Sequence, residues 1–217
     1  MRIRKRKWVE AELEQCDFFV KEPEMNKGKW NTLLQKEQPI YLELGCGKGS
    51  FASQFGIKNP NINLIAVDIK NDMLGLAKRK IEKVYNEKPV QNILLVCKNV
   101  EKIEDLFSKQ DKITRIYINF CNPWPRKKHK KRRLTHIRQL EHYKTFLLPG
   151  SKIYFKTDDD ELFEETLMYL DEAGFEVDKI TRDLHSENMP ENIITEHETM
   201  FSEQGIKIKF LIATYKE

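Results

Sequence analysis

Cysteine is scarce in this sequence, and its spacing is unlike that of the common cysteine sites. The 217 residues include four cysteines, and no two of them form the C-x-x-C pair that zinc sites and thiol redox sites commonly use. A chain of this length buries roughly 70% of its unfolded surface in one core, so it does not need disulfides. We therefore predict reduced thiols, a cytoplasmic protein and no metal site.

Long apolar runs are also absent. The longest is Ile93 to Cys97, far short of the ~20 residues that cross a bilayer as a helix. The start is basic, but Glu10, Glu12 and Glu14 follow where a signal peptide has its apolar stretch. The sequence predicts no membrane-spanning helix, no export signal and no membrane partner.

Acidic residues are missing from two segments of an otherwise acidic chain. The 38 Lys and Arg and 34 Asp and Glu leave a net charge of +4, yet residues 1–7 contain five cations and residues 126–133 contain seven, with no acid in either. This concentration predicts a polyanionic partner, and Trp124 before the second run and His129 inside it favour nucleic acid. A solvated charged face is the alternative. A membrane surface fits less well, because residues 126–133 have no apolar face.

Short apolar runs alternate with helical stretches from Pro39 onward, which indicates an α/β fold with a mostly parallel sheet. The last two expected strands would pair as an antiparallel edge. We expect residues 1–38 to be a basic arm appended to a single domain at 39–217. The expected strands are 40–44, 64–68, 93–97, 116–120, 152–156, 175–180 and 206–215, and the expected helices are 50–58, 71–85, 101–107, 135–147 and 162–173.

A glycine-rich turn follows the first expected strand. Gly45, Gly47 and Gly49 have no side chains to keep a ligand away from the backbone. In an open parallel sheet, ligands bind beyond the carboxyl ends of the strands. Glycines alone do not distinguish a ligand site from a tight connection between strand and helix. Glu43, two residues before the first glycine, also suits a cationic cofactor.

Polar residues also end the next two strands. Asp68 lies about 20 residues beyond the glycines, where an acid accepts hydrogen bonds from ribose hydroxyls, or it is a helix N-cap. Asn99 either meets an adenine edge or caps the helix after it. The E-x-G-x-G-x-G pattern resembles that of class I S-adenosylmethionine methyltransferases more than the G-x-G-x-x-G turn of nicotinamide enzymes. This resemblance implies a Rossmann-like fold with a seven-stranded, mostly parallel sheet, an antiparallel C-terminal strand, helices on both faces, and S-adenosyl-L-methionine as cofactor.

The fourth strand leads into a stiff aromatic loop. Prolines flank Trp124 in Asn122-Pro123-Trp124-Pro125, which suits stacking on a base, or packing in a rigid turn. At this loop the chain resembles the tRNA (guanine-N7)-methyltransferase family, and the resemblance extends over nearly the whole chain. It is carried by four motifs, at residues 119–125, 129–135, 155–158 and 195–198.

The resemblance implies a role for each matching residue. The family more often has glutamate at position 68 and aspartate at positions 99 and 122. The implied catalytic residues are Asn122 and Asp158, and the implied methyl-donor contacts are Glu43, Gly45, Gly47, Gly49, Asp68, Asn99 and Asn122. The implied substrate contacts are Arg126, Asp158, Thr195, Glu196, His197 and Glu198, and the implied RNA contacts are Lys128, His129, Lys130, Lys131, Arg132 and Arg133.

The implied reaction moves a methyl group from S-adenosylmethionine to N7 of the variable-loop guanosine of tRNA. N7 carries a lone pair and no proton, so alignment of nucleophile, methyl carbon and sulfur is the main requirement. One alternative is an exocyclic-amine methyltransferase, because Asn122-Pro123-Trp124 resembles an N-P-P-Y type loop. Another is a catalytically silent tRNA-binding protein in which Asn122 has replaced the aspartate. Monomer and homodimer both fit the sequence.

Overall fold

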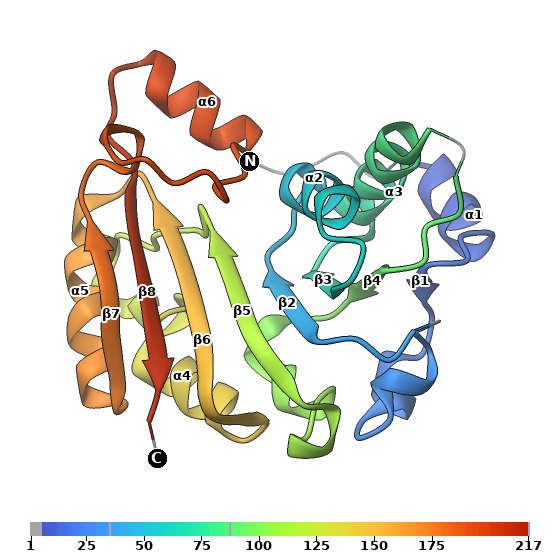
Figure 1. The fold of residues 1–217 in the computed structure, drawn as a ribbon, viewed down its shortest axis with the longest axis horizontal. Helices are drawn as coiled ribbons and strands as arrows, with labels where there is room; N and C mark the ends of the chain where they lie inside the picture. Colours follow the sequence, from blue (N-terminus) through green and yellow to red (C-terminus); the bar gives the residue numbers. More distant parts are fainter. Residues whose placement is uncertain (1–5, 35, 87, 217) are drawn as a thin grey trace.

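The computed structural model describes residues 6–34, 36–86 and 88–216, and its strands form one mixed sheet (Figure 1). The order across the sheet is β1-β4-β3-β2-β5-β6-β8-β7. Neighbours from β1 to β6 are parallel, whereas β8 is antiparallel to β6 and β7. The strands are β1 Phe19–Val20, β2 Ile40–Leu44, β3 Asn63–Asp68, β4 Ile93–Cys97, β5 Ile113–Asn119, β6 Leu147–Thr157, β7 Phe175–Thr181 and β8 Lys209–Tyr215. The expected α/β fold and antiparallel C-terminal strand are confirmed.

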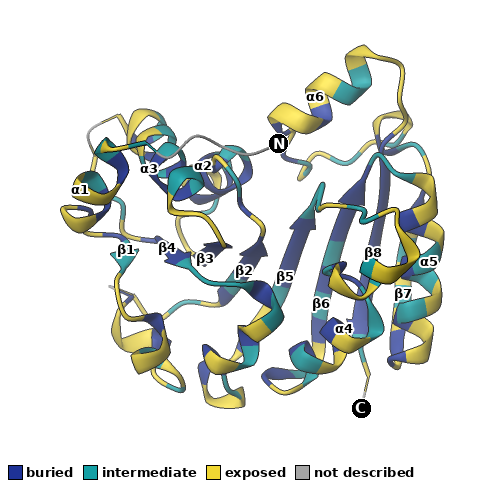
Figure 2. Ribbon diagram, turned by 180° about the vertical axis from the view of Figure 1, so that it is seen from behind, coloured by how far each residue is buried: buried dark blue, intermediate teal, exposed yellow. Residues whose placement is uncertain are grey.

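Helices cover both faces of this sheet. α2 and α3 pack together beside β3 and β4, and α1 packs on α3, whereas α4 and α5 pack on β6 and β7 from the other side (Figures 1 and 2). The helices are α1 Trp8–Glu14, α2 Ser50–Lys58, α3 Asn71–Tyr85, α4 Ile137–Lys144, α5 Asp160–Glu172 and α6 Glu196–Glu203. The helix expected at 101–107 is a 3-10 helix instead, η3 Val100–Asp105, because Lys102 departs from helical geometry.

The core lies between the sheet and its two helical layers. Every residue of β3 is buried, as a strand covered on both faces requires. Figure 2 shows the central strands β2, β3 and β4 largely in dark blue and the outer sides of the helices in yellow. The continuous apolar runs of the sequence are therefore the central strands of the sheet.

Much of the chain before Pro39 shares this core. α1 buries Val9 and Leu13, and the fully buried Trp30 lies 5.2 Å from Phe107 between ring centroids. β1 adds an eighth strand beside β4 where seven strands were expected. Two residues are too few to show an alternating pattern. Of the first basic segment, Arg2, Arg4 and Lys5 lie outside the described residues.

The fold brings several loops to one edge of the sheet. β2 and β5 are neighbours, but the chain leaves them in opposite directions, through α2 to β3 and through α4 to β6. Open parallel sheets bind ligands at such a switch point, beyond the carboxyl ends of the strands. The turn after β2 and the loop after β5 lie there, and α6 lies over the same edge (Figure 1). Within the described residues, no helix has the length and apolarity to cross a membrane.

Candidate active site

The glycine turn is braced by Asp68 from the neighbouring strand. One Asp68 oxygen, Oδ2, accepts a hydrogen bond from Gly47 N at 3.0 Å, and Oδ1 accepts one from Lys70 N at 2.9 Å. Gly49 has a positive φ of 71°, and a Cβ there would lie 2.8 Å from Ala77 Cβ on α3. Lys70, not Asp68, precedes the first residue of α3, so Asp68 is not its N-cap. The ribose contact of Asp68 stays a prediction.

A cavity lies between this turn, the end of β5 and the start of α6. Glu43 lies in the wall of this cavity, and its side chain is almost completely buried, with 3% of the residue exposed. Burial raises the pKa of Glu43 to about 8. The Asn119 amide and the Lys156 ammonium oppose this rise, and the Asp68 carboxylate adds to it. The cavity is lined by Glu43, Gly45, Cys46, Gly47, Lys48, Ser50, Phe51, Asn119, Phe120, Thr195, Glu196 and His197. The structure therefore brings together Glu43, two of the predicted glycines and three of the four residues predicted at 195–198.

Residues 195–197 close this cavity from the side of α6. Thr195 is buried and caps the helix, because its Oγ1 accepts a hydrogen bond from Glu198 N at 3.2 Å. Glu196 N donates to Ser50 Oγ at 3.2 Å, which joins the segment to α2. Glu196 also pairs with Lys80 on α3. The segment thus spans the cavity from the sheet to the helices beside the glycine turn.

Glu198 does not line the cavity but anchors the segment to β6. Its Oε2 lies 2.9 Å from Lys156 Nζ, and its Oε1 lies 2.8 Å from both Asn192 Nδ2 and His185 Nε2. Lys156 Nζ also donates to Asn192 Oδ1 at 2.6 Å and to Ile193 O at 2.9 Å. Burial alone would raise the pKa of Glu198, but Lys156 and these hydrogen bonds hold it below its usual range. Burial lowers the pKa of Lys156.

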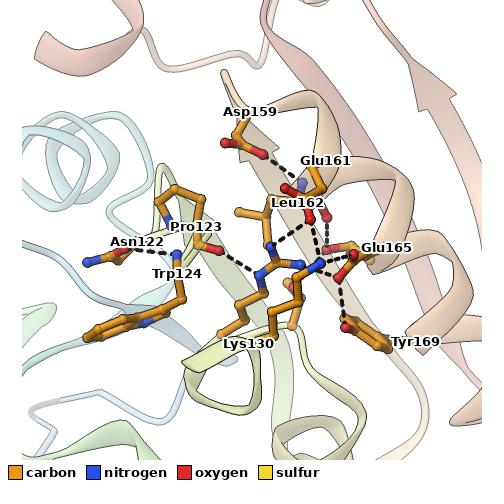
Figure 3. A network of polar contacts seen from close by, with 12 residues as sticks. Asn122, Pro123, Trp124, Lys130, Asp159, Glu161, Leu162, Glu165 and Tyr169 are labelled. Carbon is orange, nitrogen blue, oxygen red and sulfur yellow. Dashed lines mark hydrogen bonds and ion pairs between the residues drawn. The ribbon is translucent and has the colours of Figure 1, made fainter. Parts of the chain in front are cut away.

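Asn122 stands in an exposed loop after β5. Its Oδ1 accepts a hydrogen bond from Trp124 N at 3.0 Å (Figure 3). Trp124 has a positive φ of 44°, which is uncommon outside glycine. The half-buried Trp124 ring lies 5.8 Å from the His129 ring and 5.3 Å from the Arg132 guanidinium. The loop and the basic segment therefore form one surface, although neither Asn122 nor Arg126 lines the cavity.

Arg133 ties this loop to α5. It is 1% exposed, its Nε donates to Pro123 O at 2.6 Å, and its guanidinium pairs with Glu165. Lys130 pairs with Glu161 and Glu165 of the same helix (Figure 3). An RNA contact was predicted for Arg133, but its burial among protein groups leaves it no surface for one. The exposed cations of the segment are Arg126, Lys127, Lys128, Lys131 and Arg132.

Two predicted site residues lie at the ends of other strands. Asp158 follows β6 and is half-buried, and burial raises its pKa. Asp159, not Asp158, caps α5, since its Oδ1 accepts a hydrogen bond from Leu162 N at 2.7 Å. Asn99 caps η3, because its Oδ1 accepts a hydrogen bond from Glu101 N at 3.1 Å. Neither Asp158 nor Asn99 lines the cavity.

Two polar residues of this edge, one half-buried and one buried, had no predicted role. They are Asn119, at the end of β5, and Lys156, near the end of β6. Each follows an apolar stretch of its strand, and a polar residue in such a place is a signal that could have identified both.

The residues described by the structure contain no group of three or more His, Cys, Asp or Glu side chains that could hold a metal ion.

The chain is similar to known methyltransferases over most of its length. Residues 37–211 match the model of a family described as "Putative methyltransferase". A protein of Clostridium beijerinckii named tRNA (guanine-N(7)-)-methyltransferase is 60% identical over 215 residues, which cover 98% of each chain. A protein of the same name from Clostridium perfringens is 59% identical over 216 residues, which cover 98% of this chain and 99% of the relative.

Solved structures support the fold independently. The 16S rRNA methyltransferase KamB aligns with a TM-score of 0.61 at 13% identity, over 100% of this chain and 97% of KamB. The antibiotic-resistance methyltransferase Kmr aligns with a TM-score of 0.57 at 16% identity, over 82% of this chain and 87% of Kmr. Identities this low show the shared fold alone, whereas the near full-length relatives show the family. The chain therefore belongs to the tRNA (guanine-N7)-methyltransferase family.

Proposed function

We propose that this protein transfers a methyl group from S-adenosyl-L-methionine to N7 of the variable-loop guanosine of tRNA. One observation of the structure carries the proposal: a cavity with a buried acid and a glycine turn lies at the switch point of the sheet, next to a loop that joins an exposed basic segment. The relatives named for this activity align with this chain over 98% of its length, which supports the proposal. A cytoplasmic location follows from a tRNA substrate.

The residues of the cavity fit the proposed methyl donor. A Cβ on Gly47 would meet nothing within 4 Å, so the turn leaves room for a ligand at its backbone. Glu43 offers an unpartnered carboxylate oxygen to a cation, and Asp68 lies at the turn for the ribose hydroxyls. When bound, S-adenosylmethionine would supply an electrophilic methyl group on a sulfonium centre.

Methyl transfer to guanine N7 requires little general acid–base catalysis from the protein. Guanine N7 carries no proton, so no side chain has to remove one before the methyl group is transferred. Asn122 and Asp158 follow neighbouring strands and offer acceptor oxygens to the N–H groups of the target guanine. Such bonds would hold N7 in line with the methyl carbon, and a carboxylate would stabilise the base as it gains positive charge.

The exposed cations of the loop after β5 suit the tRNA backbone. Arg126, Lys128, Lys131 and Arg132 are exposed, and no acid interrupts residues 126–133. Lysine and arginine bind phosphates without reading sequence, so these residues would position the RNA rather than select the base. The His129 ring lies tilted beside Trp124 on the same surface, and both rings are available to an unpaired base for a stacking contact.

The direct test is identification of the methylated nucleoside. Unmodified tRNA is incubated with the protein and a donor labelled on its methyl group, then digested to nucleosides and analysed by mass spectrometry. We expect the label in 7-methylguanosine. Label in an N²-methylguanosine or N⁶-methyladenosine would favour the exocyclic-amine alternative. Binding of tRNA and donor without any methylated product would favour the silent RNA-binding protein.

A further inference from the structure

The peptide group between Pro123 and Trp124 is held at both of its polar atoms. Its oxygen, Pro123 O, accepts a hydrogen bond from Arg133 Nε at 2.6 Å, and its nitrogen, Trp124 N, donates one to Asn122 Oδ1 at 3.0 Å. Trp124 has a positive φ of 44°, which a residue other than glycine keeps only where its surroundings enforce it. A rotation of this peptide that broke the bond from Arg133 would therefore also release the side chain of Asn122.

Arg133 is itself held firmly by α5. It is 1% exposed, its Nη1 pairs with Glu165, and its Nη2 lies 3.9 Å from Glu161 Oε1. The hydroxyl of Tyr169 donates to Glu165 Oε2 at 2.9 Å and so fixes the carboxylate that Arg133 meets. Figure 3 shows this network between α5 and the loop of Asn122. A continuous chain of contacts therefore leads from α5 through Arg133 and the peptide to Asn122.

We propose that Arg133 is a positioning residue for the methyl transfer, because it sets the orientation of the Asn122 side chain through the peptide between them. This inference rests on the proposed function. An amide oxygen has two lone pairs. One lone pair of Asn122 Oδ1 accepts the bond from Trp124 N, which leaves the other for an N–H group of the target guanine. The first bond fixes the direction of the oxygen and thereby the place where the guanine is held.

The loop should lose this orientation without losing its attachment when Arg133 is replaced. Lys130 also pairs with Glu161 and Glu165, so a second cation holds the basic segment on α5. The exposed cations Lys128 and Lys131 lie on the other side of this attachment. Removal of the guanidinium should therefore affect the reaction more than the binding of tRNA.

The test replaces Arg133 by methionine, which keeps an unbranched side chain and removes the charge and the donors. At saturating tRNA and donor, we expect single-turnover methylation by Arg133→Met to be about 10- to 100-fold slower than by wild type, as for a misplaced reacting group. The affinities for tRNA and for S-adenosylhomocysteine should change less than about twofold. Arg133→Lys keeps the charge without the planar fork of donors and should recover part of the rate. The matched control is Arg182→Met, because Arg182 pairs with Glu164 of the same helix outside the loop, and its rate should equal that of wild type.

Two further measurements distinguish positioning from a general loss of structure. In the Asn122→Ala background, Arg133→Met should slow the reaction less than about twofold, because the side chain through which Arg133 acts is absent. The fluorescence of Trp124, obtained as the difference between each protein and its Trp124→Phe counterpart, reports on the loop without any reaction. Acrylamide should quench it more strongly in Arg133→Met than in wild type.

The possible outcomes separate the two proposals. Equal rates for wild type and Arg133→Met, or an equal slowing by Arg133→Met in the Asn122→Ala background, would overturn the positioning role and leave the proposed function standing. A loss of both affinities in step with the rate would overturn it as well. Should Arg133→Met not fold, Arg133→Lys is carried through the same comparisons. If wild type transferred no methyl group to tRNA, the proposed function would fall, and the inference with it.

Discussion

Asn122 occupies the position where the family normally has aspartate, and the structure shows what the exchange leaves intact. The Asn122 carbonyl oxygen accepts a hydrogen bond from Trp124 N, and an aspartate oxygen would accept the same bond. The loop is also held by Arg133 through Pro123 O. Its shape therefore does not depend on a charge at position 122. What changes is the strength of any bond to the target base.

We predict that Asn122 leaves the enzyme active but slower than an aspartate would. A charge-assisted hydrogen bond is about twice as strong as a neutral one, so the exchange should cost about 1 to 2 kcal/mol, or roughly 5- to 30-fold in rate. Asn122→Asp should match or exceed wild type, and Asn122→Ala should fall below both. Single-turnover methylation of unmodified tRNA at saturating donor measures this. A silent wild type revived by Asn122→Asp would mean that the aspartate is an obligatory base.

Glu43 should make the stability of the unliganded protein depend on pH. Its pKa is raised from 4.5 to about 8 by burial, so between these pH values the folded state holds a proton that the unfolded chain has lost. Stability therefore falls as pH rises through this window, by at most about 1.4 kcal/mol per pH unit. Glu43→Gln has no such titration. Urea unfolding of both proteins from pH 5 to pH 8 should show wild type losing stability relative to the variant, and parallel pH profiles would contradict a raised pKa of Glu43.

At the scale of elements, the start of α6 depends on one buried ion pair. Glu198 and Lys156 are 0% and 6% exposed in their side chains, with 2.9 Å between Nζ and Oε2. The pair holds residues 195–197 over the cavity, because Thr195 caps the same helix turn. A role for Glu198 in substrate binding stays a prediction, but its contacts in the structure are to the protein itself.

We expect Lys156→Met to destabilise the fold by about 3 to 5 kcal/mol, because it leaves the Glu198 carboxylate buried without its cation. The double variant Lys156→Met with Glu198→Gln removes both charges and should recover part of this loss. Urea unfolding compares the three proteins at one pH. If Lys156→Met were as stable as wild type, the anchoring of α6 through this pair would be contradicted.

The basic segment divides into exposed and buried cations, which should differ in their effect on RNA binding. Replacing Lys128, Lys131 and Arg132 together by alanine should lower the slope of log tRNA affinity against log salt by roughly 2 to 3 units, one released counterion for each lost phosphate contact. The matched control replaces Lys179, Arg182 and Lys216 by alanine, because these are exposed cations of β7 and of the residues that follow β7 and β8. It should leave the slope unchanged. Equal slopes for the triple variant and wild type would show that the RNA binds elsewhere.

At the scale of the whole molecule, the sequence predicts the fold better than it predicts the contacts within the site. The central strands and the glycine turn are set by local residue order, so they could be found in advance. Arg132 and Arg133 are adjacent and of one type, yet only Arg133 is buried, because it pairs with Glu165. Glu165 lies 32 residues further along the chain, so the local sequence does not indicate this pairing. The pairing of Lys156 with Glu198 likewise depends on the folded chain, 42 residues apart.

The same limit applies to the cap of α5 and to the short edge strand. Asp158 and Asp159 are both suited to cap a helix, and only the backbone geometry assigns the cap to Asp159. β1 consists of two residues whose strand character comes from pairing with β4. Both features are decided by tertiary structure, which local patterns do not contain.

The central claim is that the methyl group goes to N7 of a guanosine in tRNA. The most direct measurement is single-turnover methylation of two tRNAs that differ in one atom, with guanosine or 7-deazaguanosine at the variable-loop position. The substitution replaces N7 by a carbon and keeps the exocyclic amine. We predict one methyl group transferred per guanosine tRNA and none to the 7-deazaguanosine tRNA, although both bind equally well. Equal methylation of the two tRNAs would contradict the claim.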